Sequence, residues 1–403
     1  MKILILTGVY WPDTVSVAQH LSDLGDELSA AGHEVTVYTS RYAYDADDVY
    51  AQTEQHNGIN IVRLRNTRFG KETIFGRVMD FMTFNLLIVW KLLWINRSQF
   101  DTMIGLTVPP LLSFFGVMFA RIKGVKFLFW AMDLQPELAI ASGMMRKGSI
   151  TARFMTHMGT YIVRKANLTV ALDEYMSAHI IERGVTPKRV SSVAIWPVMS
   201  EVYLGKRLEN PFRVQHGFQD KIVIMYSGNH SYVHPLDSVL AAILALKDDP
   251  RFLFVSIGEG VRKKDVEDFA KTHQLDNIVR LPFQPRDIIH LSLGSADIQI
   301  VILGQEQVGY THPNKVYGAM FVGKPILYIG PTPSHVTDML DDCPGNISIS
   351  HGESDSLAAQ LIAFANLTQA QRDEIGQRNR DYALAHFSPE VLKAQMLEKV
   401  TQL

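Results

Sequence analysis

Residues 298–329 read IQIVILGQEQVGYTHPNKVYGAMFVGKPILYI and contain one complete repeat of the fold. An apolar run of strand length opens this stretch, and a second one closes it at residues 325–329. Between the two runs lie a loop that contains Gly309 and a helix that begins near Pro313 and ends at Gly323. A strand, a helix and a second strand in this order are typical of the βαβ unit of a parallel sheet.

The same alternation extends outward along the chain, and it predicts two Rossmann-like lobes with helices on both faces of largely parallel sheets. Helical patterns such as 236–246 and 263–272 lie between most of the strands. The strands predicted for the first lobe are Ile3 to Leu6, Val35 to Tyr38, Ile61 to Leu64, Thr102 to Leu106, Val125 to Trp130, Leu168 to Ala171 and Val190 to Ile195. Those predicted for the second lobe are Ile222 to Tyr226, Phe252 to Ile257, Ile278 to Leu281, Ile298 to Ile302, Pro325 to Ile329 and Ile347 to Ile349.

The pattern divides the chain into two domains of α/β class. We expect an N-terminal domain at 1–198, a linker at 199–216, a C-terminal domain at 217–385 and a closing C-terminal helix at 386–403. The carboxyl ends of parallel strands and the nearby helix N-termini collect ligands in such folds. A ligand is therefore expected in a cleft between the two lobes.

Composition is typical of a globular protein in a reducing compartment. The chain has 403 residues, of which 47% are hydrophobic and 20% are charged. The single cysteine, Cys343, excludes an internal disulfide and a cysteine-based zinc site. The N-terminal run before Gly8 has only six residues, from Lys2 to Thr7. This run is too short to be the apolar core of a secretory signal. These features predict a cytoplasmic protein.

Charge is distributed unevenly although the formal net charge is only -2. Residues 61–165 contain 15 Lys plus Arg and 5 Asp plus Glu, an excess of 15 - 5 = +10. The apolar stretch at 74–95 is interrupted by charged residues and so does not read as a membrane span. Two interpretations stay open for this region: an ordinary amphipathic core helix, or a peripheral contact with an anionic membrane, which would put the protein on the inner membrane face. Nucleic-acid binding is not expected, because the basic residues alternate with aliphatic ones.

Lys315 is the strongest candidate for chemistry. A helix that begins near Pro313 presents free backbone N–H groups and the positive end of its dipole, and Lys315 adds a full charge beside them. This combination is suited to a diphosphate, although a lysine in a first helical turn is often simply a solvated surface residue.

Other candidates follow the predicted strands. Gly228 permits close approach of a ligand to the backbone, and 258–259 and 283–284 follow two further strands, where each pair could also be a plain turn. Asp133 comes after a buried strand, where its carboxylate could accept a proton from a hydroxyl group, hold a sugar or cap a helix. The histidines lack ligand-like spacing and no Asp-x-Asp pair appears near a strand end, so no metal and no cofactor are expected.

An ordered set of short motifs resembles the family 4 retaining glycosyltransferases of GT-B fold, in particular the bacterial O-antigen and colanic acid group. The motifs are YWPD at 10–13, AGHEVTV at 31–37, TRFG at 67–70, MDLQPE at 132–137, YSGNHS at 226–231, HPNK at 312–315 and GKP at 323–325. The resemblance implies a second lobe that binds the nucleotide sugar and a first lobe that binds the acceptor. It also implies that Lys315 and the backbone of 309–312 hold the diphosphate, that Gly228 and Asn229 border it, and that Asp133 faces the acceptor or the donor sugar.

The sequence departs from the family in one respect. Many members carry a Glu-x7-Glu pattern whose second glutamate binds the donor ribose, whereas Tyr310 and Gly318 occupy the two glutamate positions here. Glycine offers no side chain to the ribose, and inside a helix it costs roughly 0.5–1 kcal/mol relative to alanine. Its presence favours a close approach of the nucleotide to the helix.

These observations predict a metal-independent, retaining glycosyltransferase that uses a nucleotide-sugar donor and a lipid-linked or other carbohydrate acceptor in bacterial surface polysaccharide synthesis. The predicted catalytic residues are Asp133 and Lys315, and the predicted donor-binding residues are Gly228, Asn229, His230, Gly258, Glu259, Phe283, Gln284, Gly309, Tyr310, Thr311, His312 and Gly318. The alternatives are a nucleotide-sugar 2-epimerase of the same fold and a non-catalytic nucleotide-sugar-binding partner.

Overall fold

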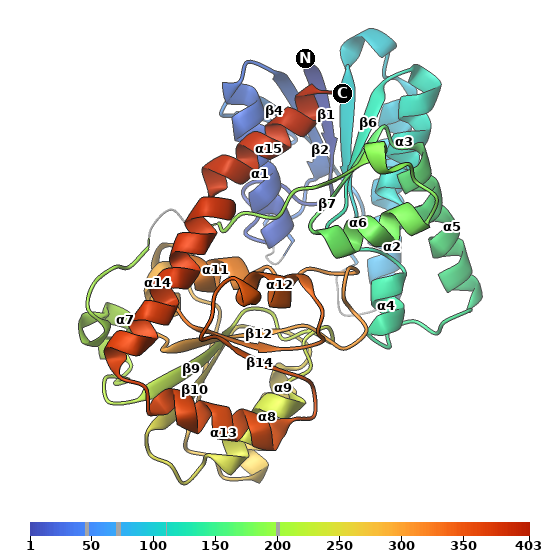
Figure 1. Ribbon diagram of the computed structural model, residues 1–403. Coiled ribbons are helices and arrows are strands. Elements are labelled where there is room, and N and C mark those ends of the chain that lie inside the picture. The colour runs from blue at the N-terminus through green and yellow to red at the C-terminus, as the bar shows by residue number, and fades with distance from the viewer. Residues whose placement is uncertain (45–47, 70–73, 110, 199–201) are drawn as a thin grey trace. The chain divides into compact units, whose positions relative to one another are not determined.

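A computed structural model of the chain describes all residues except 45–47, 70–73, 110 and 199–201, and the side chains of residues 74 and 77 (Figure 1). The chain forms two compact units. Unit 1 contains Met1–Trp196, Gly309–Thr311 and Pro389–Leu403, and unit 2 contains Pro197–Val308 and His312–Ser388.

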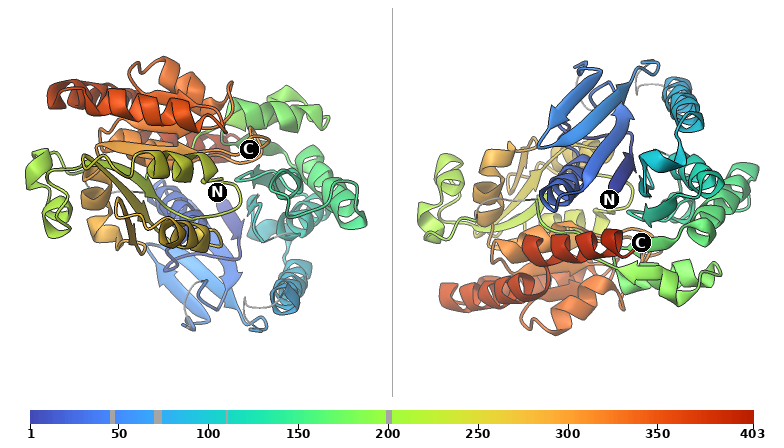
Figure 2. Two further views of the ribbon diagram at one scale, coloured as in Figure 1. Left: turned by 90° about the horizontal axis from the view of Figure 1, so that it is seen from below. Right: turned by 90° about the horizontal axis from the view of Figure 1, so that it is seen from above.

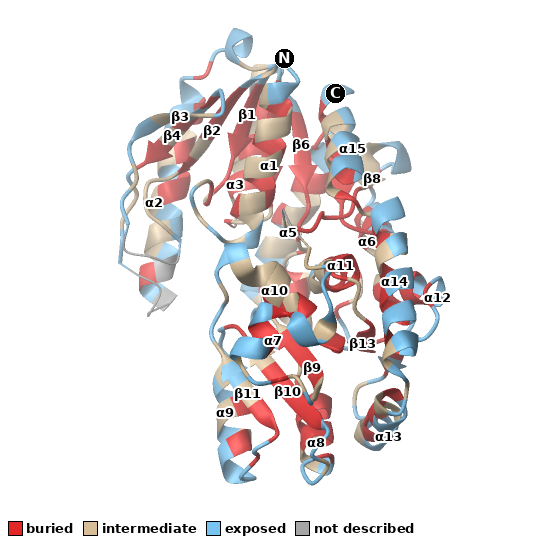
Figure 3. Ribbon diagram, turned by 90° about the vertical axis from the view of Figure 1, so that its left-hand side faces the viewer, coloured by how far each residue is buried: buried red, intermediate tan, exposed pale blue. Residues whose placement is uncertain are grey.

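Unit 1 is built on an eight-stranded sheet of order β3-β4-β2-β1-β5-β6-β7-β8. The strands are β1 (Lys2–Leu6), β2 (Glu34–Ser40), β3 (Thr53–His56), β4 (Ile59–Leu64), β5 (Thr102–Leu106), β6 (Lys126–Trp130), β7 (Leu168–Ala171) and β8 (Val190–Ser192). All neighbouring pairs are parallel except β3 and β4, which are antiparallel. The central strands are almost wholly buried (Figure 3), which explains their continuous apolar sequences.

The helices of unit 1 cover both faces of this sheet. They are α1 (Ser16–Ala30), α2 (Ile74–Leu93), α3 (Leu112–Lys123), α4 (Glu137–Ala141), α5 (Ile150–Lys165), α6 (Glu174–Glu182) and α15 (Pro389–Thr401), with short 3-10 turns η1 (Arg97–Gln99) and η2 (Pro187–Arg189). Helix α1 connects β1 to β2, whereas α2, α3 and α5 belong to connections that run in the other direction along the sheet. Because such crossovers are right-handed, α1 lies on one face of the sheet and the other three helices lie on the opposite face (Figure 2). The last helix, α15, packs on α1, where the Lys393 ammonium lies 3.4 Å from the Glu27 carboxylate.

Unit 2 is built on a six-stranded, all-parallel sheet of order β11-β10-β9-β12-β13-β14. Its strands are β9 (Ile222–Ser227), β10 (Phe252–Ile257), β11 (Ile278–Leu281), β12 (Ile298–Ile302), β13 (Ile326–Ile329) and β14 (Ile347–Ile349). Its helices are α7 (Pro211–Gln215), α8 (Asp237–Ala245), α9 (Lys263–Thr272), α10 (Ile289–Gly294), α11 (Lys315–Phe321), α12 (His335–Asp341), α13 (Ser354–Ala365) and α14 (Gln369–His386), with 3-10 turns η3 (Arg207–Glu209) and η4 (Arg286–Ile288). A large apolar core lies between the sheet and α8, α9 and α13.

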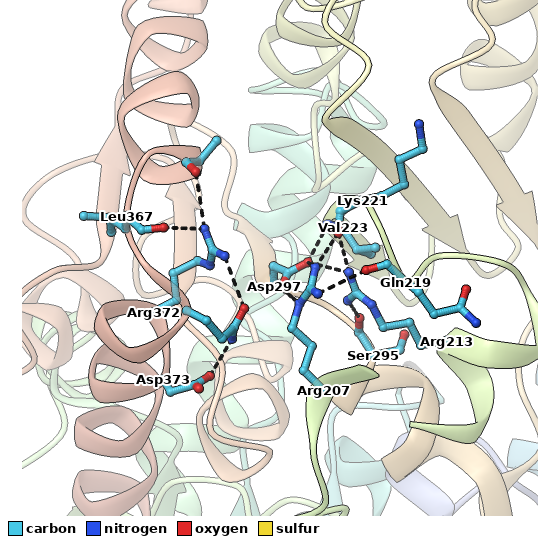
Figure 4. Close-up of polar contacts among 12 residues, drawn as sticks. Arg207, Arg213, Gln219, Lys221, Val223, Ser295, Asp297, Leu367, Arg372 and Asp373 are labelled. Carbon is cyan, nitrogen blue, oxygen red and sulfur yellow. Dashed lines mark hydrogen bonds and ion pairs between the residues drawn. The ribbon is translucent and has the colours of Figure 1, made fainter. Parts of the chain in front are cut away.

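A buried ionic cluster attaches η3 and α7 to this sheet (Figure 4). Asp297, which immediately precedes β12, accepts a hydrogen bond of 2.5 Å from Arg207 Nε and one of 3.0 Å from Arg213. Burial raises the pKa of Asp297, but the hydrogen bond from Arg207 and the charges of both arginines hold that pKa below its ordinary value. Part of the segment predicted as a linker is thus packed onto unit 2, because two arginines compensate a carboxylate that could not be buried alone.

The predicted fold class is confirmed, since both sheets and the helices between their strands are present. One strand was not predicted: β3, the antiparallel edge strand of unit 1. The roles predicted for the two lobes and the cleft between them stay predictions.

Candidate functional site

The strand order of unit 2 creates a switch point between β9 and β12. The chain moves outward from β9 to β10 and β11, and then returns to the opposite side of β9 to form β12. Loops that leave the two strands at such a point diverge, and ligands bind where they separate. Gly228 follows β9, and α11 with Lys315 follows β12, so the two strongest sequence candidates of unit 2 lie at this point.

Lys315 lies over Gly228 and Tyr226. Its ammonium nitrogen is 3.7 Å from the centre of the Tyr226 ring and donates a hydrogen bond to the Tyr226 hydroxyl. A Cβ atom added at Gly228 would lie only 2.5 Å from Lys315 Cε, so this glycine leaves the room that the lysine stem occupies. Burial lowers the pKa of Lys315 well below its ordinary value, because the ammonium has left water without gaining a carboxylate. A bound anion would supply the missing negative charge.

Two glycines form a floor of bare backbone beside this lysine. Gly228 and Gly258 have φ values of 136° and 129°, which side chains other than hydrogen rarely permit. A Cβ atom at Gly258 would collide with the Gly228 carbonyl oxygen and would lie 3.2 Å from the Phe283 ring. Gly228, Gly258 and Phe283 therefore meet, and Phe283 remains 54% exposed. An aromatic ring over bare backbone can stack against a flat nucleobase.

The two residues after Gly228 support this loop rather than extend into solvent from it. The Asn229 carbonyl oxygen accepts a 2.7 Å hydrogen bond from the Tyr226 hydroxyl. His230 is buried, and its Nε2 atom lies 2.8 Å from the Ser256 hydroxyl. Burial, with a contribution from the charge of Lys315, lowers the pKa of His230 to about 4. His230 is therefore neutral at physiological pH and adds no charge to the site.

The other predicted donor-binding residues of unit 2 include Glu259, Gln284 and His312, whose contacts are with residues close to them in the sequence. Glu259 forms a 2.5 Å ion pair with Lys263, and the Gln284 amide donates to the carbonyl of Pro282. The ring of His312 is buried and stacks on Tyr317, with ring centres 5.3 Å apart. Gly318 lies inside α11. None of these contacts excludes a ligand, and none requires one.

In unit 1 the structure brings together Asp133 and Thr311, which the sequence had assigned to different roles. Asp133 follows β6, and its carboxylate accepts a 2.7 Å hydrogen bond from the Thr311 hydroxyl. Burial raises the pKa of Asp133 to about 6, although the Thr311 hydrogen bond lowers it. A carboxylate with this pKa changes its protonation state close to neutral pH, as a residue that exchanges protons with a substrate must.

The loop 309–311 is held on unit 1 by close contacts. Gly309 has a φ of 73°, and a Cβ atom there would lie 2.6 Å from the ring of His179. Tyr310 stacks on that ring with centres 4.6 Å apart, and its carbonyl oxygen accepts a 2.8 Å hydrogen bond from the Leu134 amide. Tyr310 thus fills the first of the two family glutamate positions with a packing role.

An apolar cavity lies next to Asp133, beneath α3 and α5. Its walls include side chains of both helices and of the loops after β5 and β6; among them are Leu106, Pro109, Leu111, Met155, Met158 and Ile162. Thr107 and Arg183 are among its few polar neighbours, and Arg183 is neutralised by a 2.5 Å ion pair with Glu137. The cavity can therefore accept an apolar group beside a titratable acid.

Three supporting residues escaped sequence analysis: Tyr226, Thr107 and Arg183. Tyr226 is the last buried aromatic residue of β9 and reads as core, and Thr107 positions the Asp133 backbone through hydrogen bonds of 3.1 to 3.4 Å. Tyr226 opens the YSGNHS motif but carried no predicted role of its own, and nothing in the local sequence of Thr107 or Arg183 distinguishes them from ordinary residues. Asp173, which follows β7, caps helix α6, since its carboxylate accepts a 2.7 Å hydrogen bond from the Met176 amide.

In the described part of the chain, no three His, Cys, Asp or Glu side chains are grouped so that they could hold a metal ion. Nor does any helix there combine the length and the hydrophobicity that crossing a bilayer requires.

Comparisons with known proteins show which family and which fold the chain resembles. Residues 16–196 match the Glycosyl transferase 4-like domain. The chain is 25% identical over 255 residues to the glycosyltransferase WbjE of Pseudomonas aeruginosa, covering 61% of this chain and 63% of WbjE. It is 23% identical over 334 residues to the colanic acid biosynthesis glycosyl transferase WcaI of Escherichia coli, covering 80% of this chain and 82% of WcaI. Its fold resembles that of Anabaena HepE, crystallised with UDP-glucose, with a TM-score of 0.72 and 14% identity over the full length of both chains. The family resemblance predicted from the sequence is confirmed.

Proposed function

Because residues 16–196 are a Glycosyl transferase 4-like domain and the whole chain has the GT-B fold, we propose that the protein transfers a sugar from a nucleoside-diphosphate donor to an acceptor. The observation that carries the proposal is Lys315, a partly buried ammonium without a carboxylate partner in the described residues, at the switch point of unit 2. A diphosphate is the group that such a position would stabilise best.

In unit 2 the donor diphosphate would lie on Lys315 and the backbone of Gly228, with the nucleobase beside Phe283. Each assignment follows from what the site offers: one cation, bare backbone and one exposed ring. HepE was crystallised with UDP-glucose, which makes a UDP-sugar the first donor to test. With glycine at position 318, the ribose would be recognised without the family's second glutamate.

In unit 1 the acceptor would lie at Asp133. The apolar cavity beside this acid favours an acceptor that joins a sugar to an aliphatic chain, such as a lipid-linked saccharide of surface polysaccharide synthesis. The name of WcaI, a colanic acid biosynthesis enzyme, supports the same class of product. A lipid-linked acceptor would bring the protein into peripheral contact with an anionic membrane through residues 61–165.

The transfer would proceed with retention and without a metal ion. The bond between the anomeric carbon and the distal phosphate oxygen breaks, the electron pair stays on the phosphate, and the acceptor hydroxyl forms the new bond on the same face of the sugar. Lys315 would stabilise the charge that develops on the leaving phosphate. The proton of the acceptor hydroxyl passes to the departing phosphate or to Asp133.

Thermal unfolding with UDP-, GDP- and TDP-sugars tests the donor, since a specific ligand raises the melting temperature by mass action. Transfer to a short-chain lipid-linked sugar then tests the reaction, with and without EDTA. We expect one nucleotide class to stabilise the protein and the rate to be unaffected by EDTA. Epimerisation of the donor without acceptor, or donor binding without any transfer, would replace the proposal with one of its two rivals.

A further inference from the structure

We propose that the outward face of α2 is a membrane-docking surface that inserts shallowly into an anionic lipid bilayer. This inference rests on the proposed function for its purpose, the delivery of a lipid-linked acceptor, but not for its evidence. The evidence is the distribution of apolar and charged side chains over unit 1.

Helix α2 has two apolar faces, of which unit 1 buries only one. Phe84, Ile88 and Leu92 are spaced by one turn, are at most 3% exposed and face the contacts of α2 with α3 and β4. The second face carries large apolar residues that no part of the described chain covers; it consists of Phe75 (71% exposed), Val78 (47%), Met82 (52%), Leu86 (65%), Trp90 (60%) and Leu93 (49%). These residues also recur every three or four positions, so they form a continuous stripe about 30 Å long on a 20-residue helix.

The exposed stripe is too regular to be a chance scatter of surface residues. Single exposed hydrophobic residues are common on soluble proteins, whereas contiguous apolar surfaces usually mark an interaction site. At the C-terminal end of α2, the rings of Trp90 and Trp94 pack edge to face with their centres 5.8 Å apart. Trp94 is 69% exposed. Tryptophan favours the boundary between lipid headgroups and acyl chains.

Basic residues are concentrated in the part of the sequence that includes this end of the stripe. Between residues 81 and 132 the sequence has five basic residues and a single acidic one, Asp101. The bases are Lys91, Arg97, Arg121, Lys123 and Lys126. The Lys123 ammonium donates a 3.0 Å hydrogen bond to the Leu93 carbonyl oxygen, which fixes one cation at the end of α2. Ile122, 68% exposed, adds an apolar side chain from α3 to the same region.

The combination favours a bilayer over a protein partner. Cations beside an apolar stripe match the negative headgroups and the acyl chains of an anionic leaflet, and a helix of this composition lies in the membrane plane with its apolar face about 5–10 Å deep. The buried face of α2 stays packed on α3 and β4 in this arrangement, so binding requires no unfolding of unit 1.

Flotation with lipid vesicles tests the inference on the full chain. The vesicles contain phosphatidylethanolamine with phosphatidylglycerol, or phosphatidylcholine alone. The test variant combines Leu86→Glu and Trp90→Glu, whose side chains are exposed and so tolerate the change. The matched control combines Leu204→Glu and Leu208→Glu, which replace two exposed apolar residues of unit 2 (71% and 56%) with the same charge.

We expect the wild type to bind the anionic vesicles, with affinity falling as salt increases, and to bind phosphatidylcholine weakly. The α2 variant should lose roughly 10²-fold or more in affinity for the vesicles, because two apolar side chains no longer enter the bilayer. The control variant should bind like the wild type. All three proteins should show the same melting temperature and the same shift with a nucleotide sugar.

Absence of wild-type binding at low salt would overturn the inference, as would normal binding by the α2 variant. A wild-type dimer in light scattering that this variant converts to a monomer, without vesicle binding, would make the face an interface between copies and would also overturn it. Vesicle binding without a shift by any nucleotide sugar would instead remove the proposed function and leave the membrane surface standing.

Discussion

Replacement of Lys315 by methionine separates the chemistry of the donor site from its packing. Methionine keeps an unbranched apolar chain of similar length over Gly228 and the Tyr226 ring, but it removes the ammonium group. The matched control is Lys221→Met. Lys221 lies at the opposite, amino end of β9, where its ammonium hydrogen-bonds only to the Pro250 carbonyl oxygen in the described contacts, at 2.8 Å.

The expected loss follows from the charge that Lys315 supplies. A unit charge about 4 Å from a phosphate oxygen contributes about 4 kcal/mol at an effective dielectric constant of about 20. Since about 1.4 kcal/mol corresponds to a factor of ten, the variant should lose roughly 10³ in rate, at the upper end of the range for a single preorganised donor. The stability of the Lys315 variant, by contrast, should increase. Burial lowers the pKa of Lys315, so removal of this cation should raise the free energy of unfolding at neutral pH.

The assay measures transfer from a nucleotide sugar to a lipid-linked acceptor for the wild type, Lys315→Met and Lys221→Met, together with unfolding in urea. The reasoning predicts a slow but stable Lys315 variant and a normal Lys221 variant. A Lys315 variant with wild-type turnover would refute it. A Lys315 variant that is slow because it is less stable than the wild type would also refute it. The reasoning expects the opposite, because the variant loses a cation that has no counter-charge in the empty site.

Three further results are expected. Because burial raises the pKa of Asp133 to about 6, turnover that needs its carboxylate should rise with pH through about 6. Thr311→Val removes a hydrogen bond that lowers this pKa, so a pH–rate profile of this variant should show the rise at higher pH. Gly228→Ala should abolish donor-induced thermal stabilisation, since its Cβ atom would lie 2.5 Å from Lys315 Cε at a backbone angle that alanine rarely adopts. At pH values between the pKa of Lys315 in the free and in the bound protein, donor binding should take up a proton, because the diphosphate raises a pKa that burial had lowered. Affinity should therefore fall as pH rises through this range, and calorimetry in buffers of different ionisation enthalpy measures the proton.

The sequence was sufficient to predict the sheets because their strands are buried on both faces. Strands such as β5 and β12 are wholly buried and read as uninterrupted apolar runs, so their limits could be predicted to the residue. β3 was missed for the opposite reason. Its sequence, TEQH, lies at the sheet edge, pairs only with β4 and has no buried residue, so it carries no apolar alternation to detect.

The segment predicted as a linker shows what a local pattern cannot reveal. Arg207 and Arg213 look like solvated charges in sequence, because their partner Asp297 is 84 to 90 positions away. The same limit applies to the site. Asp133 and Thr311 are 178 positions apart, and only the folded chain shows that one hydroxyl group tunes the acid. Lys315, by contrast, could be identified early, since a proline, a lysine and two glycines close together mark a helix start near bare backbone.

The two candidate sites share one physical design, which argues that they serve one reaction. Each holds an ionisable group that a substrate could engage in a place where burial opposes its charge: an ammonium in unit 2 and a carboxylate in unit 1. Neither group contributes to the stability of the empty protein in its charged form, so stability alone gives no reason for it to be there. The ammonium would gain its counter-charge from a donor phosphate, and the carboxylate would gain a proton from an acceptor hydroxyl. The two groups would therefore both have a favourable partner only when donor and acceptor are bound together. A transferase must act in that state, and it must leave a donor that is bound alone intact.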